Sequence, residues 1–158
     1  MVAVSTDTIY HILQGVTDPE IPVISVLELG IVRNVEIGDD GHIEVSITPT
    51  YSGCPAMDVI PVLIREAIVD AGYPDVHVQN VLSPAWTTDW ITDEGRKKLK
   101  AFGIAPPDIQ KAHAPEHVEC PHCGSTNTEV VSFFGSTPCK AAYRCKTCLE
   151  PFDYFKCH

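Results

Sequence analysis

Two Cys-x-x-Cys motifs near the C-terminus constrain the fold of this chain more than any other part of its sequence. They are Cys120-Pro-His-Cys123 and Cys145-Lys-Thr-Cys148, with residues 124–144 between them. Such a motif on a tight turn directs two sulfurs at one point, about 2.3 Å from each, and two such turns complete a tetrahedron. The spacing is slightly longer than the usual one of about 15–20 residues. The four cysteines therefore predict a metal site.

The segment that carries these motifs also needs the metal for its stability. A segment of roughly 45 residues buries too little apolar surface to form an adequate core alone. Four apolar residues between the motifs fit a β-hairpin, namely Val130, Val131, Phe133 and Phe134. We therefore predict a zinc ribbon over residues 118–158, with zinc as a structural ion.

Iron in a rubredoxin-like site is the alternative for the four cysteines. We call the turn that carries each Cys-x-x-Cys motif a knuckle. Leu149 follows Cys148 at a place where the knuckle of such an iron site is expected to have glycine, and this disfavours iron. Cys139 and Cys157 remain outside the four ligands, as spare thiols, a second site or a pair. His122 and His158 are expected to be exposed rather than to bind the metal.

Composition limits the classes of function. The chain has 158 residues and seven cysteines, of which only Cys54 precedes Cys120. Without a secretion signal or a long apolar window we expect it to be cytoplasmic, where paired Cys-x-x-Cys motifs indicate metal before disulfides. The net charge of −10 repels nucleic acid and anionic membranes, so we expect neither as a partner. An acidic surface of this kind suits protein partners that carry basic patches.

Cys54 lies in a stretch that changes from a strand pattern to a helix pattern. Ile43, Val45 and Ile47 alternate with polar residues, as in a half-buried strand, and apolar residues at helical spacing follow from Ala56. The unpaired N–H groups and the dipole at a helix N-terminus favour a thiolate, the form that binds metal. The alternative is that Cys54 is a small buried apolar residue.

A stiff loop with two carboxylates precedes this stretch. Residues 6–15 predict an amphipathic helix, and Thr17-Asp-Pro-Glu-Ile-Pro22 ends it with two prolines. Asp18 and Glu20 could orient a metal ion or a basic group of a partner, or the triplet could be a turn. Farther on, residues 32–43 predict a β-hairpin and residues 75–83 another strand.

The two tryptophans, Trp86 and Trp90, lie in a polar loop before a short helix that Thr92 caps. They either cover the core or anchor a partner protein. Residues 105–117 are rich in proline and are interpreted as a linker. The predicted fold is α+β: a small α/β domain over residues 1–104, the linker, and the zinc ribbon over residues 118–158.

Three segments of the N-terminal part resemble the metal–sulfur cluster biosynthesis domain of SufT-like iron–sulfur assembly factors. They are Asp18-Pro-Glu20, Glu28-Leu-Gly-Ile31 and the stretch Thr48-Pro-Thr to Gly-Cys54-Pro. This resemblance covers about residues 5–103. It implies a small α/β domain of the iron–sulfur-assembly type in which Cys54, Asp18 and Glu20 take part in metal or cluster transfer.

Four longer motifs resemble the PaaD subunit family of phenylacetate degradation. They are SPAWTTDWIT at 83–92, GIAPP at 103–107, FGST-x-CKA at 134–141 and CKTCLEPFDYFKCH at 145–158. Members of this family accompany a multicomponent phenylacetyl-CoA 1,2-epoxidase, which has a di-iron oxygenase and an iron–sulfur flavin reductase.

The resemblance implies a maturation factor rather than an enzyme. Such a protein would insert iron or a transient iron–sulfur cluster into the oxygenase or the reductase, with Trp86, Trp90 and the ribbon in contact with the partner. The alternative is an integral electron-transfer or coupling component of the epoxidase with an iron-bearing four-cysteine site. A homodimer is compatible with either function.

Overall fold

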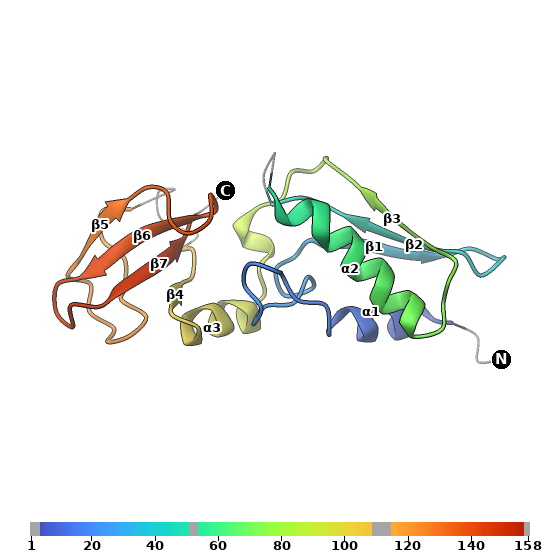
Figure 1. The fold of residues 1–158 in the computed structure, drawn as a ribbon, viewed down its shortest axis with the longest axis horizontal. Coiled ribbons are helices and arrows are strands. Elements are labelled where there is room, and N and C mark those ends of the chain that lie inside the picture. The colour runs from blue at the N-terminus through green and yellow to red at the C-terminus, as the bar shows by residue number, and fades with distance from the viewer. Residues whose placement is uncertain (1–3, 51–53, 109–114, 157–158) are drawn as a thin grey trace. The chain divides into compact units, whose positions relative to one another are not determined.

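A computed structural model describes residues 4–50, 54–108 and 115–156 of the chain (Figure 1). Its internal contacts group the chain into two units, residues 1–86 and 87–158. Among the described residues, none of the helices has the length and apolarity that a membrane span requires.

The first unit is a three-stranded sheet with two helices. Helix α1 (Thr6–Leu13) precedes the strands β1 (Val32–Ile37) and β2 (Ile43–Ile47), which form an antiparallel hairpin. Helix α2 (Ala56–Asp70) then leads to β3 (Val76–Asn80), which pairs with β2 in parallel. The sheet order is β1-β2-β3, so the predicted hairpin is confirmed and the third strand joins it through a helical crossover.

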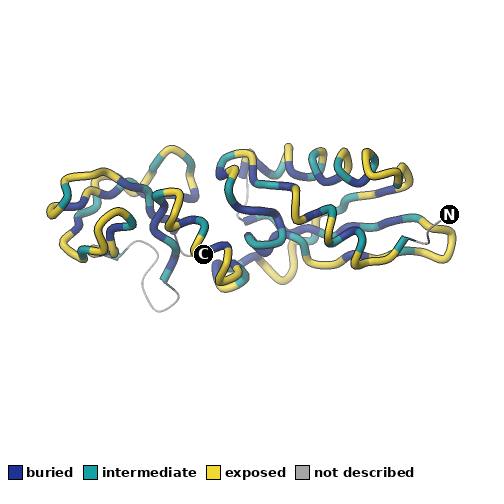
Figure 2. The backbone as a smooth tube through the Cα atoms, turned by 90° about the horizontal axis from the view of Figure 1, so that it is seen from below, coloured by how far each residue is buried: buried dark blue, intermediate teal, exposed yellow. Residues whose placement is uncertain are grey.

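The pattern of apolar residues explains how these elements pack. In β2, Ile43, Val45 and Ile47 are buried, as the period-2 alternation predicts. Helix α2 buries one face, formed by Ala56, Ile60, Ile64 and Ile68, and packs against β3 and α1. Figure 2 shows the opposite side of its turns exposed. The helix begins at Ala56, and Pro61 lies inside it.

The second unit combines a short helix with a four-stranded sheet. It begins with a 3₁₀ turn, η1 (Thr88–Trp90), and helix α3 (Asp93–Ala101), whose predicted cap Thr92 accepts a hydrogen bond from the N–H of Gly95. The strands are β4 (Ile104–Ala105), β5 (Thr128–Ser132), β6 (Lys140–Cys145) and β7 (Pro151–Phe155). They lie in the order β4-β7-β6-β5, and only β4 and β7 pair in parallel.

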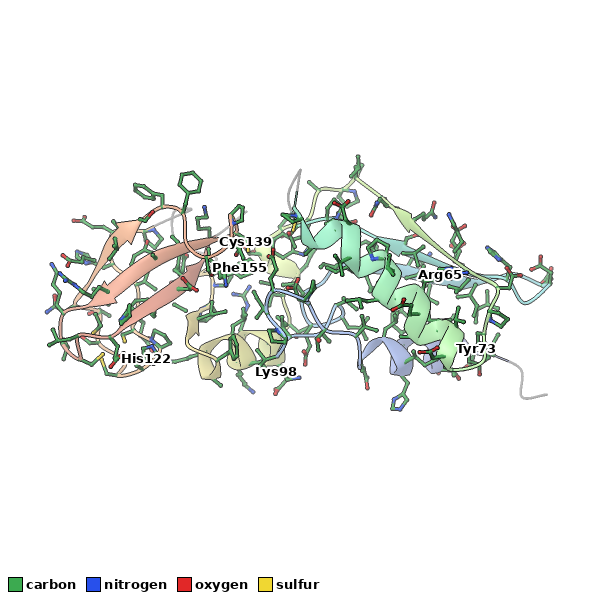
Figure 3. All side chains as sticks on the ribbon, viewed as in Figure 1. Arg65, Tyr73, Lys98, His122, Cys139 and Phe155 are labelled. Carbon is green, nitrogen blue, oxygen red and sulfur yellow. The ribbon has the colours of Figure 1, made fainter. Side chains whose placement is uncertain are left out.

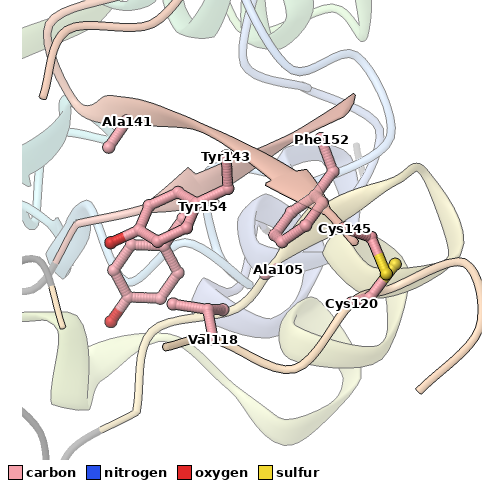
Figure 4. Close-up of a cluster of buried hydrophobic side chains, with 8 residues drawn as sticks. All are labelled: Ala105, Val118, Cys120, Ala141, Tyr143, Cys145, Phe152 and Tyr154. Atoms are coloured by element: carbon pink, nitrogen blue, oxygen red, sulfur yellow. The ribbon is translucent and has the colours of Figure 1, made fainter. Parts of the chain in front are cut away.

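The core of the second unit is small and includes two of the predicted metal ligands (Figure 4). Cys120 and Cys145 are fully buried beside Tyr143, Phe152 and Tyr154. The ring of Tyr143 stacks on Phe152 with centroids 5.8 Å apart and meets the edge of Tyr154 at 5.6 Å. A cluster of eight residues is little apolar burial for a sheet of this size, which is consistent with a need for metal.

The predicted domain limits at residues 104 and 118 fall inside the second unit. Ala105, predicted to begin a linker, is buried in β4 and pairs with Tyr154 of β7. His117 contacts the carbonyl oxygen of Thr128 through its Nδ1 atom at 2.9 Å. The division into a domain, a linker and a ribbon stays a prediction about which segments fold independently.

Candidate metal centre and the Cys54 loop

The four cysteines of the two motifs converge on one point. Their sulfur atoms all lie within 4.8 Å of one another. The Sγ atoms of Cys120 and Cys148 are 3.8 Å apart, and those of Cys123 and Cys145 are 3.6 Å apart. A tetrahedron with metal–sulfur bonds of about 2.3 Å has edges of about 3.8 Å. The four thiols therefore fit a tetrahedral ion, and Cys120, Cys123, Cys145 and Cys148 are the residues that would hold it.

Both knuckles close through a residue in the left-handed conformation. Gly124, which follows the first motif, has φ 76°, and Leu149, at the equivalent place in the second, has φ 68°. The side chain of Leu149 is 73% exposed, so it leaves the knuckle unobstructed. Leu149 therefore does not by itself disfavour iron, because it adopts the conformation for which glycine was expected.

The backbone of the second knuckle favours a thiolate at Cys145. Hydrogen bonds from the N–H groups of Cys148 and Thr147 lower the pKa of Cys145 to about 6. A hydrogen bond from the N–H of Glu150 lowers the pKa of Cys148, but burial and the neighbouring thiols outweigh it and raise the value to about 12. The first proton therefore leaves Cys145, and a cation between the sulfurs favours loss of the others.

Cys54 lies where the sequence predicted it, between β2 and the N-terminus of α2. It is 8% exposed, and its carbonyl oxygen accepts a hydrogen bond from the N–H of Met57 in the first turn of the helix. Residues 51–53, on its N-terminal side, lie outside the described residues. Thr48, in the same stretch, is 1% exposed, and its hydroxyl has no hydrogen-bond partner among the described residues. The sequence does not predict this buried hydroxyl, because Thr48 falls at a polar position of the alternation that begins at Ile43, where an exposed side chain is expected.

The loop with the two carboxylates is held by one of them. Asp18 is buried, and its Oδ1 atom accepts hydrogen bonds from the N–H groups of Glu20 at 2.8 Å and Ile21 at 2.9 Å. Glu20 is half-buried. In Figure 1 this loop lies at the same end of the first unit as the N-terminus of α2. Asp18 thus fixes the shape of a loop near that end.

The two tryptophans differ in their surroundings. Trp86 is 4% exposed, and its indole N–H donates to the carbonyl oxygen of Leu29 at 2.9 Å. This arrangement favours the alternative in which Trp86 belongs to the core of the first unit. Trp90 is half-buried at the end of η1. Its role as a contact for a partner stays a prediction.

The remaining cysteines and histidines lie outside the four-sulfur site. Cys139 is buried immediately before β6, whereas Cys157 and His158 lie outside the described residues. His122 is exposed in the first knuckle, as predicted. Figure 3 labels Cys139 and His122 toward opposite ends of the sheet of the second unit.

Two family models match this chain. The model of the PaaD zinc beta ribbon domain matches residues 105–156, and that of an iron–sulfur cluster assembly protein matches residues 6–82. These matches confirm the predicted fold, an assembly-type α/β part followed by a zinc ribbon. Together with the four converging sulfurs, they indicate that the second unit binds metal.

Similar proteins match either nearly the whole chain or about three fifths of it. The chain is 50% identical over 151 residues to an Escherichia coli protein that is named as a 1,2-phenylacetyl-CoA epoxidase subunit, covering 94% of this chain and 91% of that protein. It is 35% identical over 94 residues to an Fe-S protein maturation auxiliary factor of Porphyromonas gingivalis, covering 59% of this chain and 89% of that protein. A solved structure of a conserved hypothetical protein from Thermotoga maritima aligns with a TM-score of 0.54 and 30% identity, covering 63% of this chain and 98% of that one.

Proposed function

Because this chain belongs to the PaaD family of phenylacetyl-CoA epoxidase subunits, we propose that it is a non-catalytic accessory protein that matures the epoxidase. It inserts iron or an iron–sulfur cluster into the oxygenase or the reductase subunit. One observation carries this proposal. The stretch that presents Cys54 at the start of α2 lies within the part of the chain that matches iron–sulfur cluster assembly proteins.

Cys54 is the residue that carries the cargo in this proposal. Its position places it immediately before the first turn of α2, a helix of 15 residues. Loading replaces the thiol proton of Cys54 by iron, and the proton passes to solvent. Delivery exchanges this sulfur for a thiolate or carboxylate of the client, without net oxidation or reduction.

The two carboxylates of the loop between α1 and β1 have different roles in this proposal. One positions the loop, and the other contacts the cargo or the client. The two hydrogen bonds that Asp18 accepts hold the loop in a turn. Glu20, which is half-buried, is then the carboxylate that meets the cargo or a basic group of the client. Asp18 is a positioning residue, and Asp18→Asn weakens loading less than Cys54→Ser.

The ribbon is structural in this proposal and binds zinc. When bound, the ion supplies the positive charge that keeps four thiolates at one point. Cys120 and Cys145 extend the core of the second unit to the ion, while Cys123 and Cys148 close the site from its exposed side. The ribbon then offers a rigid surface for the client.

Anaerobic loading of the purified protein tests the role of Cys54. Wild type, Cys54→Ser and Cys139→Ser are reconstituted with iron and sulfide, and bound iron, sulfide and zinc are measured. Cys139 is a matched control, because it is another buried cysteine outside the four-sulfur site. We expect Cys54→Ser alone to lose bound iron and sulfide while its zinc content is unchanged. Equal loading of all three proteins would contradict the proposal.

An electron carrier is the second candidate function. It is favoured by the four-sulfur tetrahedron, since a rubredoxin-like iron fits the same ligands as zinc. The electron carrier and the maturation factor differ in the visible absorption expected of the purified protein and in the cysteines that would hold iron. An as-isolated protein with visible charge-transfer absorption that is lost in Cys123→Ser but kept in Cys54→Ser would support the carrier.

A further inference from the structure

An exposed apolar surface lies at the connection between β5 and β6. It consists of Val131, Phe133 and Phe134, which are 65%, 58% and 74% exposed, and we call it the aromatic tip. Exposed apolar residues are ordinary when scattered, but three of them within four consecutive residues, two of them phenylalanines, indicate a contact surface. The pairing of Thr128 with Cys145 places the other end of this hairpin beside the metal ligands. The aromatic tip is therefore at the far end of the ribbon from the metal.

A network of hydrogen bonds holds the tip in one shape. The buried ammonium group of Lys156 donates to the carbonyl oxygen of Phe133 at 2.9 Å. The N–H of Gly135 donates to the carbonyl oxygen of Lys140 at 2.7 Å, and the Ser136 hydroxyl donates to Asp153 at 3.3 Å. A side chain at Gly135 would approach Asp153 Oδ1 to 3.1 Å, so the loop is closely fitted there. The aromatic rings are thus presented on a fixed support, and little entropy is lost when a partner binds them.

The residues that hold the aromatic tip in place carry a positive charge. Lys140 and Lys156 are each 5% exposed, and Lys140 lies 3.6 Å from Asp153. Lys156 lies 4.9 Å from the ring centroid of Phe134, and no carboxylate pairs with it among the described residues. A buried ammonium is costly unless an opposite charge approaches it. This end of the ribbon is therefore locally cationic on a chain whose net charge is −10.

The edge of the sheet is not suited to strand addition at this place. The register of β5 and β6 shifts between Val130 and Ser132, which leaves Val131 in a bulge. Bulges interrupt the regular row of backbone donors and acceptors that an added strand would need. Recognition must then use the side chains of the tip.

We propose that the aromatic tip docks a segment of a partner protein that presents apolar side chains beside a carboxylate. Phe133 and Phe134 anchor the apolar side chains, and the carboxylate compensates the charge of Lys156. The identity of the partner rests on the proposed function, which makes the oxygenase and reductase subunits of the epoxidase the proteins to test.

Binding of each purified subunit to the zinc-loaded full-length protein tests the proposal. The variants are Phe134→Ala and Lys156→Met, where methionine keeps an apolar stem under the ring but removes the charge. Phe102→Ala is the matched control, because Phe102 is 51% exposed and follows α3, away from the tip. We expect Phe134→Ala to raise the Kd for one subunit by about tenfold or more, as for a central aromatic contact. Lys156→Met should also raise the Kd, because the carboxylate of the partner would lose the charge that it compensates.

The outcomes separate this inference from the proposed function. Loss of binding in Phe134→Ala, with unchanged zinc content and unchanged iron loading at Cys54, supports the docking surface. Equal Kd values for wild type, Phe134→Ala and Phe102→Ala overturn it, even if Cys54 proves to load iron. Self-association that Phe134→Ala abolishes, without binding to either subunit, also overturns it, because the tip would then contact a second copy of this chain.

Discussion

At the scale of single residues, Leu149 is the clearest case of a side chain in a conformation that it does not favour. Its φ of 68° costs about 1–2 kcal/mol for an ordinary L-residue, and its exposed side chain contributes little packing in return. Leu149→Gly removes this strain but makes the unfolded chain more flexible. We expect a net gain of about 0.5–1 kcal/mol in the free energy of unfolding of the metal-bound ribbon, measured with denaturant.

Gly124 in the first knuckle provides the opposite test. It has φ 76°, and a Cβ there would meet nothing within 4 Å, so Gly124→Ala introduces strain without a clash. We expect it to lower the free energy of unfolding by about 1 kcal/mol. If Leu149→Gly and Gly124→Ala lower the free energy of unfolding equally, the left-handed conformation of Leu149 is not what limits the stability of the second knuckle.

A pH-dependent contact joins the β1–β2 turn to the residue before β3. Nδ1 of His42 lies 2.8 Å from Oδ1 of Asp75, and this hydrogen bond raises the pKa of His42 above its ordinary value of 6.5. A raised pKa means that the folded state binds the proton more tightly. The contribution is therefore complete below about pH 6.5 and is lost as pH rises through the raised pKa.

A double-mutant cycle isolates this contact from the other titrating groups. The cycle uses His42→Gln, Asp75→Asn and the double variant, with thermal unfolding at pH 5.5 and pH 8.5. We expect a small stabilising coupling at pH 5.5 that vanishes at pH 8.5, since the pair is exposed to solvent. A coupling that is unchanged between the two values would show that the charge on His42 plays no part.

At the scale of elements, we expect the ribbon to depend on its metal, because β5, β6 and β7 share only a small core. Removal of the ion leaves four thiols within 4.8 Å of one another, two of them fully buried. We expect a chelator to unfold residues 118–156, since metal binding and folding are one equilibrium in such modules. Amide hydrogen exchange should then become fast in β5–β7 while α2 and β1–β3 stay protected.

Cys123→Ser should have the same effect without a chelator, and Cys139→Ser should not. Protected β5–β7 amides after complete metal removal would contradict this prediction.

The elements differ in how far the sequence predicts them. Helix α2 and the β1–β2 hairpin follow from periodicity, because Ile60, Ile64 and Ile68 define one face and Gly38–Gly41 form the turn. The pairing of the two-residue strand β4 with β7 cannot be predicted from local patterns. Ile104 and Ala105 form a strand only because they pair with residues about fifty positions away in the sequence. Phe133 and Phe134 resemble strand residues by type, yet β5 ends at Ser132 because the bulge at Val131 turns the chain away.

The candidate sites were predictable to different degrees. The four metal ligands are a spacing pattern, and a spacing pattern can be read from the sequence directly. The buried indole of Trp86 could not be read in this way, because its hydrogen bond is to Leu29, in a loop far away in the sequence. The support of the aromatic tip was missed for the same reason. Lys156 reaches Phe133 across the sheet, and nothing in the local sequence marks a lysine as buried.

At the scale of the whole molecule, the two units differ in how their cysteines are arranged. Unit 1 has a single cysteine at a helix N-terminus, and unit 2 has four that converge on one point. A lone thiolate leaves a bound metal open to exchange, whereas four thiolates enclose it. We infer that the chain separates a transferable cargo from a permanent structural ion. Maturation should then fail when Cys54 is changed although the zinc ribbon remains intact.

The iron content of the client subunits shows whether Cys54 is needed for maturation. The oxygenase and reductase subunits are purified from cells that lack this protein and carry wild type, Cys54→Ser or Cys139→Ser, and iron per polypeptide is determined. We expect wild type and Cys139→Ser to yield one subunit with its full iron content, and Cys54→Ser to yield the low content of cells without the protein. Fully loaded subunits in cells that carry Cys54→Ser at normal abundance would contradict it.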